Sequence, residues 1–138
     1  MGPPIQPPGG EGLERLRALC ALLRVHCPWD REQTLESMQG LVAEEGGEVR
    51  AAIEAGDWAN LREEVGDVLF NLLLLTRIAE ERGLFDWDAV CAAEAEKMIR
   101  RHPHVFEGAS AGTAAEAVAA FERVKAAERR ADRGDASG

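Results

Sequence analysis

Five acidic residues form two groups whose spacing could build a metal site: Glu44, Glu45 and Glu48, then Glu64 and Asp67. An α-helix turns by about 100° per residue, so Glu45 and Glu48 share one helix face, as do Glu64 and Asp67. Carboxylate oxygens are the ligands that hard cations such as Mg²⁺ prefer. The pattern predicts a divalent-cation site, provided that the two groups face each other.

A turn between the groups would bring them face to face. The dipeptide at 56–57, Gly-Asp, reads as a helix stop followed by a helix start. Measured from its glycine, Glu45 mirrors Asp67, and Glu48 mirrors Glu64. A helical hairpin centred on this dipeptide would therefore place the carboxylates level with one another.

The alternative to a metal site is a pair of solvated helix faces. Such faces usually carry Lys or Arg four residues after each acid. The residues at that spacing are Glu48, Val49, Ala52, Val68 and Asn71. None of them is cationic. Glu64 and Asp67 also border an apolar run, 68–75, and carboxylates near a core need a partner or a metal. A metal site is therefore favoured, and Asn71 is either a satisfied core amide or an extension of that site towards a ligand.

A basic block lies further along the chain. From Lys97 to His104 there are three basic residues, two histidines and no acid, whereas 44–67 holds eight acids and two arginines. Lys97, Arg100 and Arg101 could supply charge-assisted hydrogen bonds to phosphate. The simpler interpretation is that cations stabilise the C-terminus of a helix.

The segment from Cys27 to Asp30, Cys-Pro-Trp-Asp, predicts a rigid turn that carries an aromatic side chain. Trp29 is expected in the core more often than as a platform on which a base stacks. Cys27 has neither an adjacent base nor a C-x-x-C partner and is interpreted as structural. The sequence contains no P-loop, dinucleotide fingerprint or nucleophile elbow.

Composition limits the class of protein. A chain of 138 residues with a formal net charge of −9 fits one domain and argues against a general binder of nucleic acid or anionic membranes. The three cysteines are odd in number, which indicates reduced thiols and a cytoplasmic location. No segment is long and apolar enough to predict a membrane span.

The hydrophobic spacing predicts an all-α fold between a disordered arm, 1–10, and a disordered tail, 131–138. The expected helices are 11–25, 34–55, 57–82, a fourth from 86 to before Pro103, and a fifth opening at 113–116. The segment 26–33 is expected to be a loop. Gly46 and Gly47 fall inside the second helix, where each glycine costs about 1 kcal/mol against alanine. That cost predicts a close approach by a neighbouring helix or a ligand, or a local break in the helix.

Five sequence blocks in this order resemble the MazG-type nucleoside triphosphate pyrophosphohydrolases of the all-α pyrophosphatase superfamily. The blocks are C-P-W-D-R-E-Q-T, A-E-E-G-G-E-V, R-E-E-V-G-D-V-L-F, R-R-H-P-H-V-F and F-E-R-V-K-A-A-E. The resemblance covers roughly 13–130 and implies a bundle of four to five helices in a stand-alone, single-domain form, 11–130. It also implies a homodimer or homotetramer, because packing between subunits completes the site in this family.

The resemblance implies hydrolysis of a nucleoside triphosphate to a monophosphate and pyrophosphate with Mg²⁺, for which Mn²⁺ could substitute. The implied metal ligands are Glu45, Glu48, Glu64 and Asp67. Glu44 would act from outside the ligand set or orient the water. The residues expected near phosphates or nucleotide are Lys97, Arg100, Arg101, Trp29 and Asp30. Two departures from the family pattern are the glycine pair at 46–47 and Phe121, which stands where tryptophan is usual.

Other functions remain compatible with the sequence. Within the superfamily they are an all-α dUTPase or dCTPase and a phosphoribosyl-ATP pyrophosphohydrolase, although the C-P-W-D and R-R-H-P-H-V-F blocks favour the MazG type. A ferritin-like di-iron protein should show E-x-x-H pairs, and none occurs here. A non-catalytic helical interaction module is the remaining alternative. The preferred base and sugar, the number of metal ions and the cellular role are open.

Overall fold

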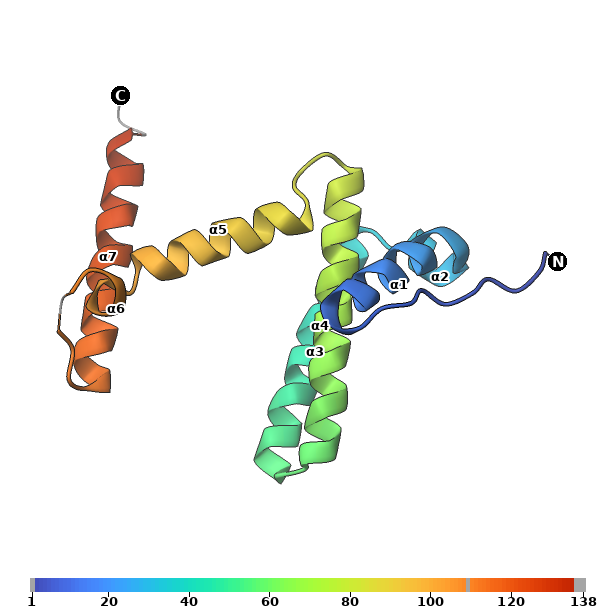
Figure 1. Ribbon diagram of the computed structural model, residues 1–138, viewed down its shortest axis with the longest axis horizontal. Coiled ribbons are helices and arrows are strands. Elements are labelled where there is room, and N and C mark those ends of the chain that lie inside the picture. Colours follow the sequence, from blue (N-terminus) through green and yellow to red (C-terminus); the bar gives the residue numbers. More distant parts are fainter. Residues whose placement is uncertain (1, 109, 136–138) are drawn as a thin grey trace. The chain divides into compact units, whose positions relative to one another are not determined.

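The computed structural model describes residues 2–108 and 110–135, and that part of the chain is helical without strands (Figure 1). The helices are α1 Gly12–His26, α2 Pro28–Glu32, α3 Leu35–Ala55, α4 Trp58–Glu81, α5 Trp87–Arg100, α6 Pro103–Phe106 and α7 Ala114–Asp135. The prediction of an all-α chain is confirmed. The chain divides into two compact units, Met1–Trp87 and Asp88–Gly138, and each is described by itself below.

Two short helices lie where no helix was predicted from the sequence. Pro28 is the first residue of α2, and Pro103 is the first residue of α6. Proline breaks a helix interior, but its fixed φ and missing N–H suit the first helical position. The expected loop at 26–33 is therefore wrong. The last long helix, α7, also runs on to Asp135, into the segment expected to be a tail.

The hairpin predicted in the first unit is present. Gly56 ends α3 in the left-handed region, at φ 65°, and its N–H donates to the carbonyls of Ala52 and Ile53. The N–H of Asp57 also bonds Ala52, which completes a Schellman-type stop. The Asp57 carboxylate then accepts from the N–H of Asn60 at 3.1 Å and caps α4. The two helices therefore lie side by side (Figure 1).

The core of the first unit forms where α1, α3 and α4 meet. Its buried members are Cys20, Met38, Leu73, Leu74 and Ile78. The apolar run 68–75 supplies two of them, and its Leu69, Phe70 and Leu75 pack against the same cluster. The apolar run therefore contributes directly to the core of the first unit. Among the helices described, none has the length and apolar character needed to cross a membrane.

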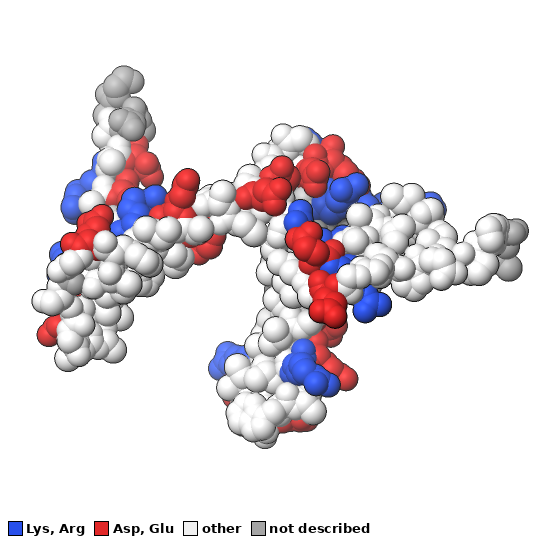
Figure 2. All heavy atoms as spheres, in the orientation of Figure 1, with Lys and Arg blue, Asp and Glu red and all other residues white. Residues whose placement is uncertain are grey.

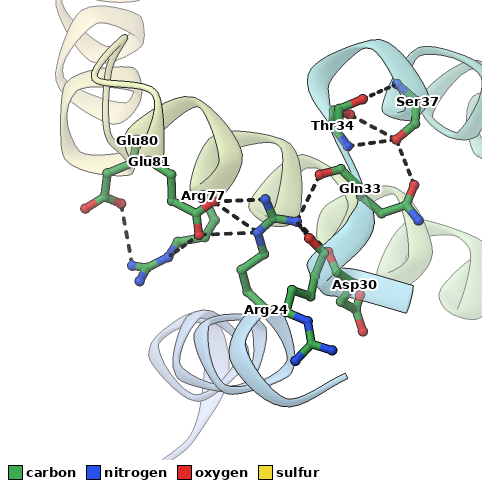
Figure 3. Close-up of polar contacts among 9 residues, drawn as sticks. Arg24, Asp30, Gln33, Thr34, Ser37, Arg77, Glu80 and Glu81 are labelled. Carbon is green, nitrogen blue, oxygen red and sulfur yellow. Dashed lines mark hydrogen bonds and ion pairs between the residues drawn. The ribbon is translucent and has the colours of Figure 1, made fainter. Parts of the chain in front are cut away.

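Arg24 joins α1 to α2 and α4 (Figure 3). Its Nη1 donates to the carbonyls of Asp30, Arg31 and Gln33, which close the α2 segment. Its Nε and Nη2 donate to the carboxylate of Glu81 on α4, at 3.1 and 2.9 Å from Oε2. One guanidinium therefore satisfies three backbone carbonyls and one acid, and it fixes α2 against the longer helices.

The glycine pair at 46–47 is not explained by close packing. A Cβ built at either position meets no heavy atom within 4 Å, and both residues lie in regular helix. We expect Gly46→Ala and Gly47→Ala each to raise the free energy of unfolding by about 0.5–1 kcal/mol, because alanine loses less backbone entropy on folding. Urea denaturation of the two variants measures this. A decrease in stability would show that the glycines contact another molecule, such as a second copy of the chain.

The three thiols differ in environment. Cys20 is buried, Cys27 is half-buried, Cys91 is exposed, and all three are free. Burial is the main reason that the pKa of the Cys20 thiol is raised to about 11, with the Asp30 charge adding to it. Since the thiolate is the reactive form, we expect a thiol reagent at pH 8 to modify Cys91 rapidly and Cys20 only after denaturation. Mass spectrometry of peptides from native and urea-treated protein measures both. Equal labelling in the native protein would contradict the described core.

In the second unit, α6 packs against α7 around Phe121. The His102 ring meets the Phe121 ring edge-on at 5.7 Å, and the Arg101 guanidinium lies over its face at 5.4 Å. Glu128, two turns further along α7, accepts hydrogen bonds from Arg100 and Arg101. Figure 2 shows acidic and basic side chains interspersed on the face in view, as such ion pairs require.

Candidate metal centre

Three of the predicted carboxylates meet across the α3–α4 hairpin. One oxygen each from Glu45, Glu64 and Asp67 lies within 4.8 Å of the other two. Glu45 comes from α3, and the other two come from successive turns of α4. Glu45 and Glu64 are half-buried, whereas Asp67 is exposed, so the expectation that Asp67 sits near the core is wrong. This open, all-oxygen cluster has one side against the hairpin and one side towards solvent.

Glu64 is influenced by the other carboxylates around it. The pKa of Glu64 is raised, and desolvation is the largest cause. A hydrogen bond with the Glu45 carboxyl and the negative charges of Glu45, Asp67 and Glu48 raise it further. Among the described residues, no Lys or Arg forms an ion pair with any of the five acids. A divalent cation would reverse this repulsion, and three carboxylates suit Mg²⁺, which keeps several waters of its own. The residues fit a metal.

Glu48 and Glu44 lie outside the group of three. Both side chains are exposed on α3. Glu48 is nevertheless close enough for its charge to raise the pKa of Glu64. The hairpin therefore brings the second acidic group to Glu45, while Glu48 borders the cluster and Glu44 occupies the outer side of the helix.

The residues predicted near a nucleotide differ in exposure. Trp29 is 53% exposed, so the expectation of a core tryptophan is wrong and its ring is free to stack. Asp30 is only 7% exposed, which leaves little of its carboxylate for a ligand. Asn71 is half-buried one turn beyond Asp67, and its amide has no hydrogen-bond partner among the described residues. The satisfied core amide is therefore not found.

The three basic residues predicted to bind phosphate, which lie in the second unit, are each paired with an acid. Lys97 contacts Glu94 at 2.7 Å, one turn earlier on α5. Arg100 and Arg101 share the carboxylate of Glu128 on α7. Glu128 was missed in the sequence analysis, although it belongs to the last of the five family blocks. An acid seven residues after an aromatic, on one face of a helix, was the available indication.

A fold made of helices, with an acidic centre on a hairpin, defines an all-α protein with a candidate divalent-metal site. The MazG nucleotide pyrophosphohydrolase domain family matches residues 33–106, which include the whole hairpin and the start of the second unit. The chain belongs to this family.

Curated relatives and a solved structure agree with the family. The chain is 44% identical over 103 residues to the nucleoside triphosphate pyrophosphohydrolase of Escherichia coli K12, covering 75% of this chain and 39% of that protein. It is 38% identical over 127 residues to the protein of that name from Mycolicibacterium smegmatis, covering 91% and 39%. A mazG-related protein from Thermotoga maritima has a TM-score of 0.71 and 29% identity, over 82% of this chain and 98% of that one. The chain spans less than half the length of these curated relatives.

Proposed function

We propose that this protein hydrolyses nucleoside triphosphates to nucleoside monophosphates and pyrophosphate, with Mg²⁺ at the hairpin. The observation that carries the proposal is the cluster of Glu45, Glu64 and Asp67 within the segment matched by the family. The names of the relatives at 44% and 38% identity support the same activity. Mn²⁺ is expected to substitute, because its oxygen-ligand preference is similar.

In this proposal, Glu45, Glu64 and Asp67 hold the metal, and Glu48 joins them from the border of the cluster. Bound Mg²⁺ supplies neutralisation of phosphate oxygens and a lower pKa for a water molecule. The water oxygen attacks the α-phosphorus, the bond to the bridging oxygen breaks, and pyrophosphate leaves. We assign Glu44, from outside the ligand set, to orient the water or accept its proton; this role rests on the family resemblance, since the side chain is exposed on α3. No covalent nucleophile is required.

The basic residues and the exposed tryptophan complete the proposed assignments. Lys97, Arg100 and Arg101 bind phosphate oxygens and stabilise charge on the departing pyrophosphate. Trp29 and Asn71 face the nucleotide, and the buried Asp30 supports the turn that carries Trp29. These roles rest on the residue types and on the family, and their exposure in the structure supports Trp29 more strongly than Asp30.

We further propose that the protein assembles as a homodimer or homotetramer in the cytoplasm. Large apolar side chains on the hairpin are exposed, including Ile53, Trp58 and Val65. Exposed apolar groups of this kind are typical of surfaces that a partner covers. Light scattering coupled to gel filtration measures the mass, and a monomer at micromolar concentration would contradict the assembly.

A nucleotide panel tests the activity. We expect the common ribo- and deoxyribonucleoside triphosphates to yield monophosphate and pyrophosphate in equal amounts with Mg²⁺, and no turnover with EDTA. Chromatography of the nucleotides and an enzymatic assay of pyrophosphate measure both products. Formation of nucleoside diphosphate and orthophosphate, or turnover in EDTA, would contradict the proposal. A protein inactive on every nucleotide would instead support the non-catalytic module.

A further inference from the structure

Glu128 of α7 makes a contact that the proposed reaction does not use directly. Its two carboxylate oxygens are divided between neighbouring arginines at the end of α5. Oε1 accepts from Nε of Arg100, and Oε2 accepts from Nε and Nη2 of Arg101, at 3.1 and 2.8 Å. Hydrogen bonds from both guanidiniums hold the pKa of the Glu128 carboxyl below its usual range. The acid therefore stays ionised at neutral pH.

The contact with Glu128 leaves some N–H donors of the two guanidiniums unpaired. A guanidinium offers five N–H groups. Glu128 engages Arg101 along its Nε–Nη2 edge and Arg100 through Nε alone, so the Nη1 groups of both arginines have no partner among the described residues. Arg101 is held further by the face of Phe121, and its side chain is 17% exposed against 52% for Arg100. Both guanidinium groups are thus held by Glu128 and keep unpaired N–H donors.

We propose that Glu128 is a positioning residue, which orients Arg100 and Arg101 so that their free Nη groups bind the polyphosphate of the substrate. The inference rests on the proposed function, since it deepens the role of the two arginines. Glu128 does not touch the substrate, and it stays bound to both arginines when the phosphate arrives. An adjacent negative charge would by itself weaken anion binding. The orientation of two long side chains outweighs that effect, because a bidentate guanidinium binds phosphate only in a fixed geometry.

The test compares Glu128→Gln with wild type in the full chain. We expect KM for the triphosphate to rise about tenfold and kcat to change less than threefold, because glutamine cannot accept from both guanidiniums as strongly. Asp132→Asn is the matched control, since it removes the same charge from the exposed side of α7 one turn later. KM should not rise in that variant. A role of Glu128 as a mere competing anion predicts the opposite, a lower KM in Glu128→Gln.

A measurement on the unmodified protein covers the case in which that variant fails to fold. In ¹H–¹⁵N spectra, assigned with Arg100→Lys and Arg101→Lys, the Nε–H signals of both arginines should persist when Mg²⁺ and inorganic tripolyphosphate are added. Their loss on addition would show that Glu128 is displaced and would overturn the inference. If the wild-type protein is active and Glu128→Gln has an unchanged KM, this inference is overturned and the proposed function is not. No turnover in the wild type would overturn the proposed function as well.

Discussion

Replacing Glu64 by Gln should reduce kcat/KM for the triphosphate by about 10²–10³-fold, the cost of losing one preorganised stabilising group. Glu64 shares the three-oxygen cluster with Glu45 and Asp67, and its own pKa is raised by burial and by those neighbours. The neutral amide keeps the shape of the side chain but removes a charge that the cation needs. The apparent Mg²⁺ concentration for half-maximal activity should therefore rise together with the loss of turnover.

Steady-state kinetics over a Mg²⁺ titration measure both effects, and Mn²⁺ binding followed by electron paramagnetic resonance measures the site without turnover. Glu63→Gln is the matched control, because Glu63 is an exposed acid of α4 outside the cluster. It should behave as wild type. We also expect Glu48→Gln to abolish turnover, since the family resemblance places a ligand there. Wild-type activity in Glu64→Gln would show that the carboxylate cluster of the hairpin takes no part in the reaction.

Replacing Arg24 by Met should lower the free energy of unfolding by about 3–5 kcal/mol, the range for breaking a buried charged network. The Arg24 side chain is 12% exposed and serves three carbonyls and the Glu81 carboxylate together (Figure 3). Methionine fills much of the volume but leaves all four acceptors without this donor. Because those carbonyls close α2, we also expect the turn that carries Trp29 to loosen before the rest of the first unit.

Urea denaturation followed by circular dichroism measures the stability, and hydrogen exchange of the α2 amides reports on the turn. Arg82→Met is the control, because Arg82 is exposed and reaches Glu36 only at 3.4 Å. An exposed pair of this kind contributes about 0–1 kcal/mol. If the two variants were equally stable, the network around Arg24 would not have the structural role described here.

The hairpin was predictable because its signals are local. A glycine in the left-handed region, an aspartate cap and mirrored acids each depend on a few neighbouring residues, and the helical period places the acids without further information. Exposure was less predictable. Trp29 and Asp30 are adjacent, yet one is exposed and the other buried, because the short helix α2 directs them to different sides.

The contacts between distant segments were not predictable from the sequence. Arg24 meets Glu81, and Arg101 meets Glu128, through packing that no local pattern encodes. Pro28 and Pro103 were read as breaks because proline disrupts helix interiors, whereas each begins a short helix. The same residue type thus disrupts a helix interior but suits a helix start.

Hydrolysis in ¹⁸O-labelled water tests most directly whether the reaction occurs at the α-phosphorus with metal held by the hairpin. With Mg²⁺ and wild-type protein, mass spectrometry should find one ¹⁸O atom in the nucleoside monophosphate and none in the pyrophosphate. Turnover and labelling should both be lost in Glu64→Gln and retained in Glu63→Gln. Label in the pyrophosphate, or labelled monophosphate from Glu64→Gln at the wild-type rate, would contradict the account.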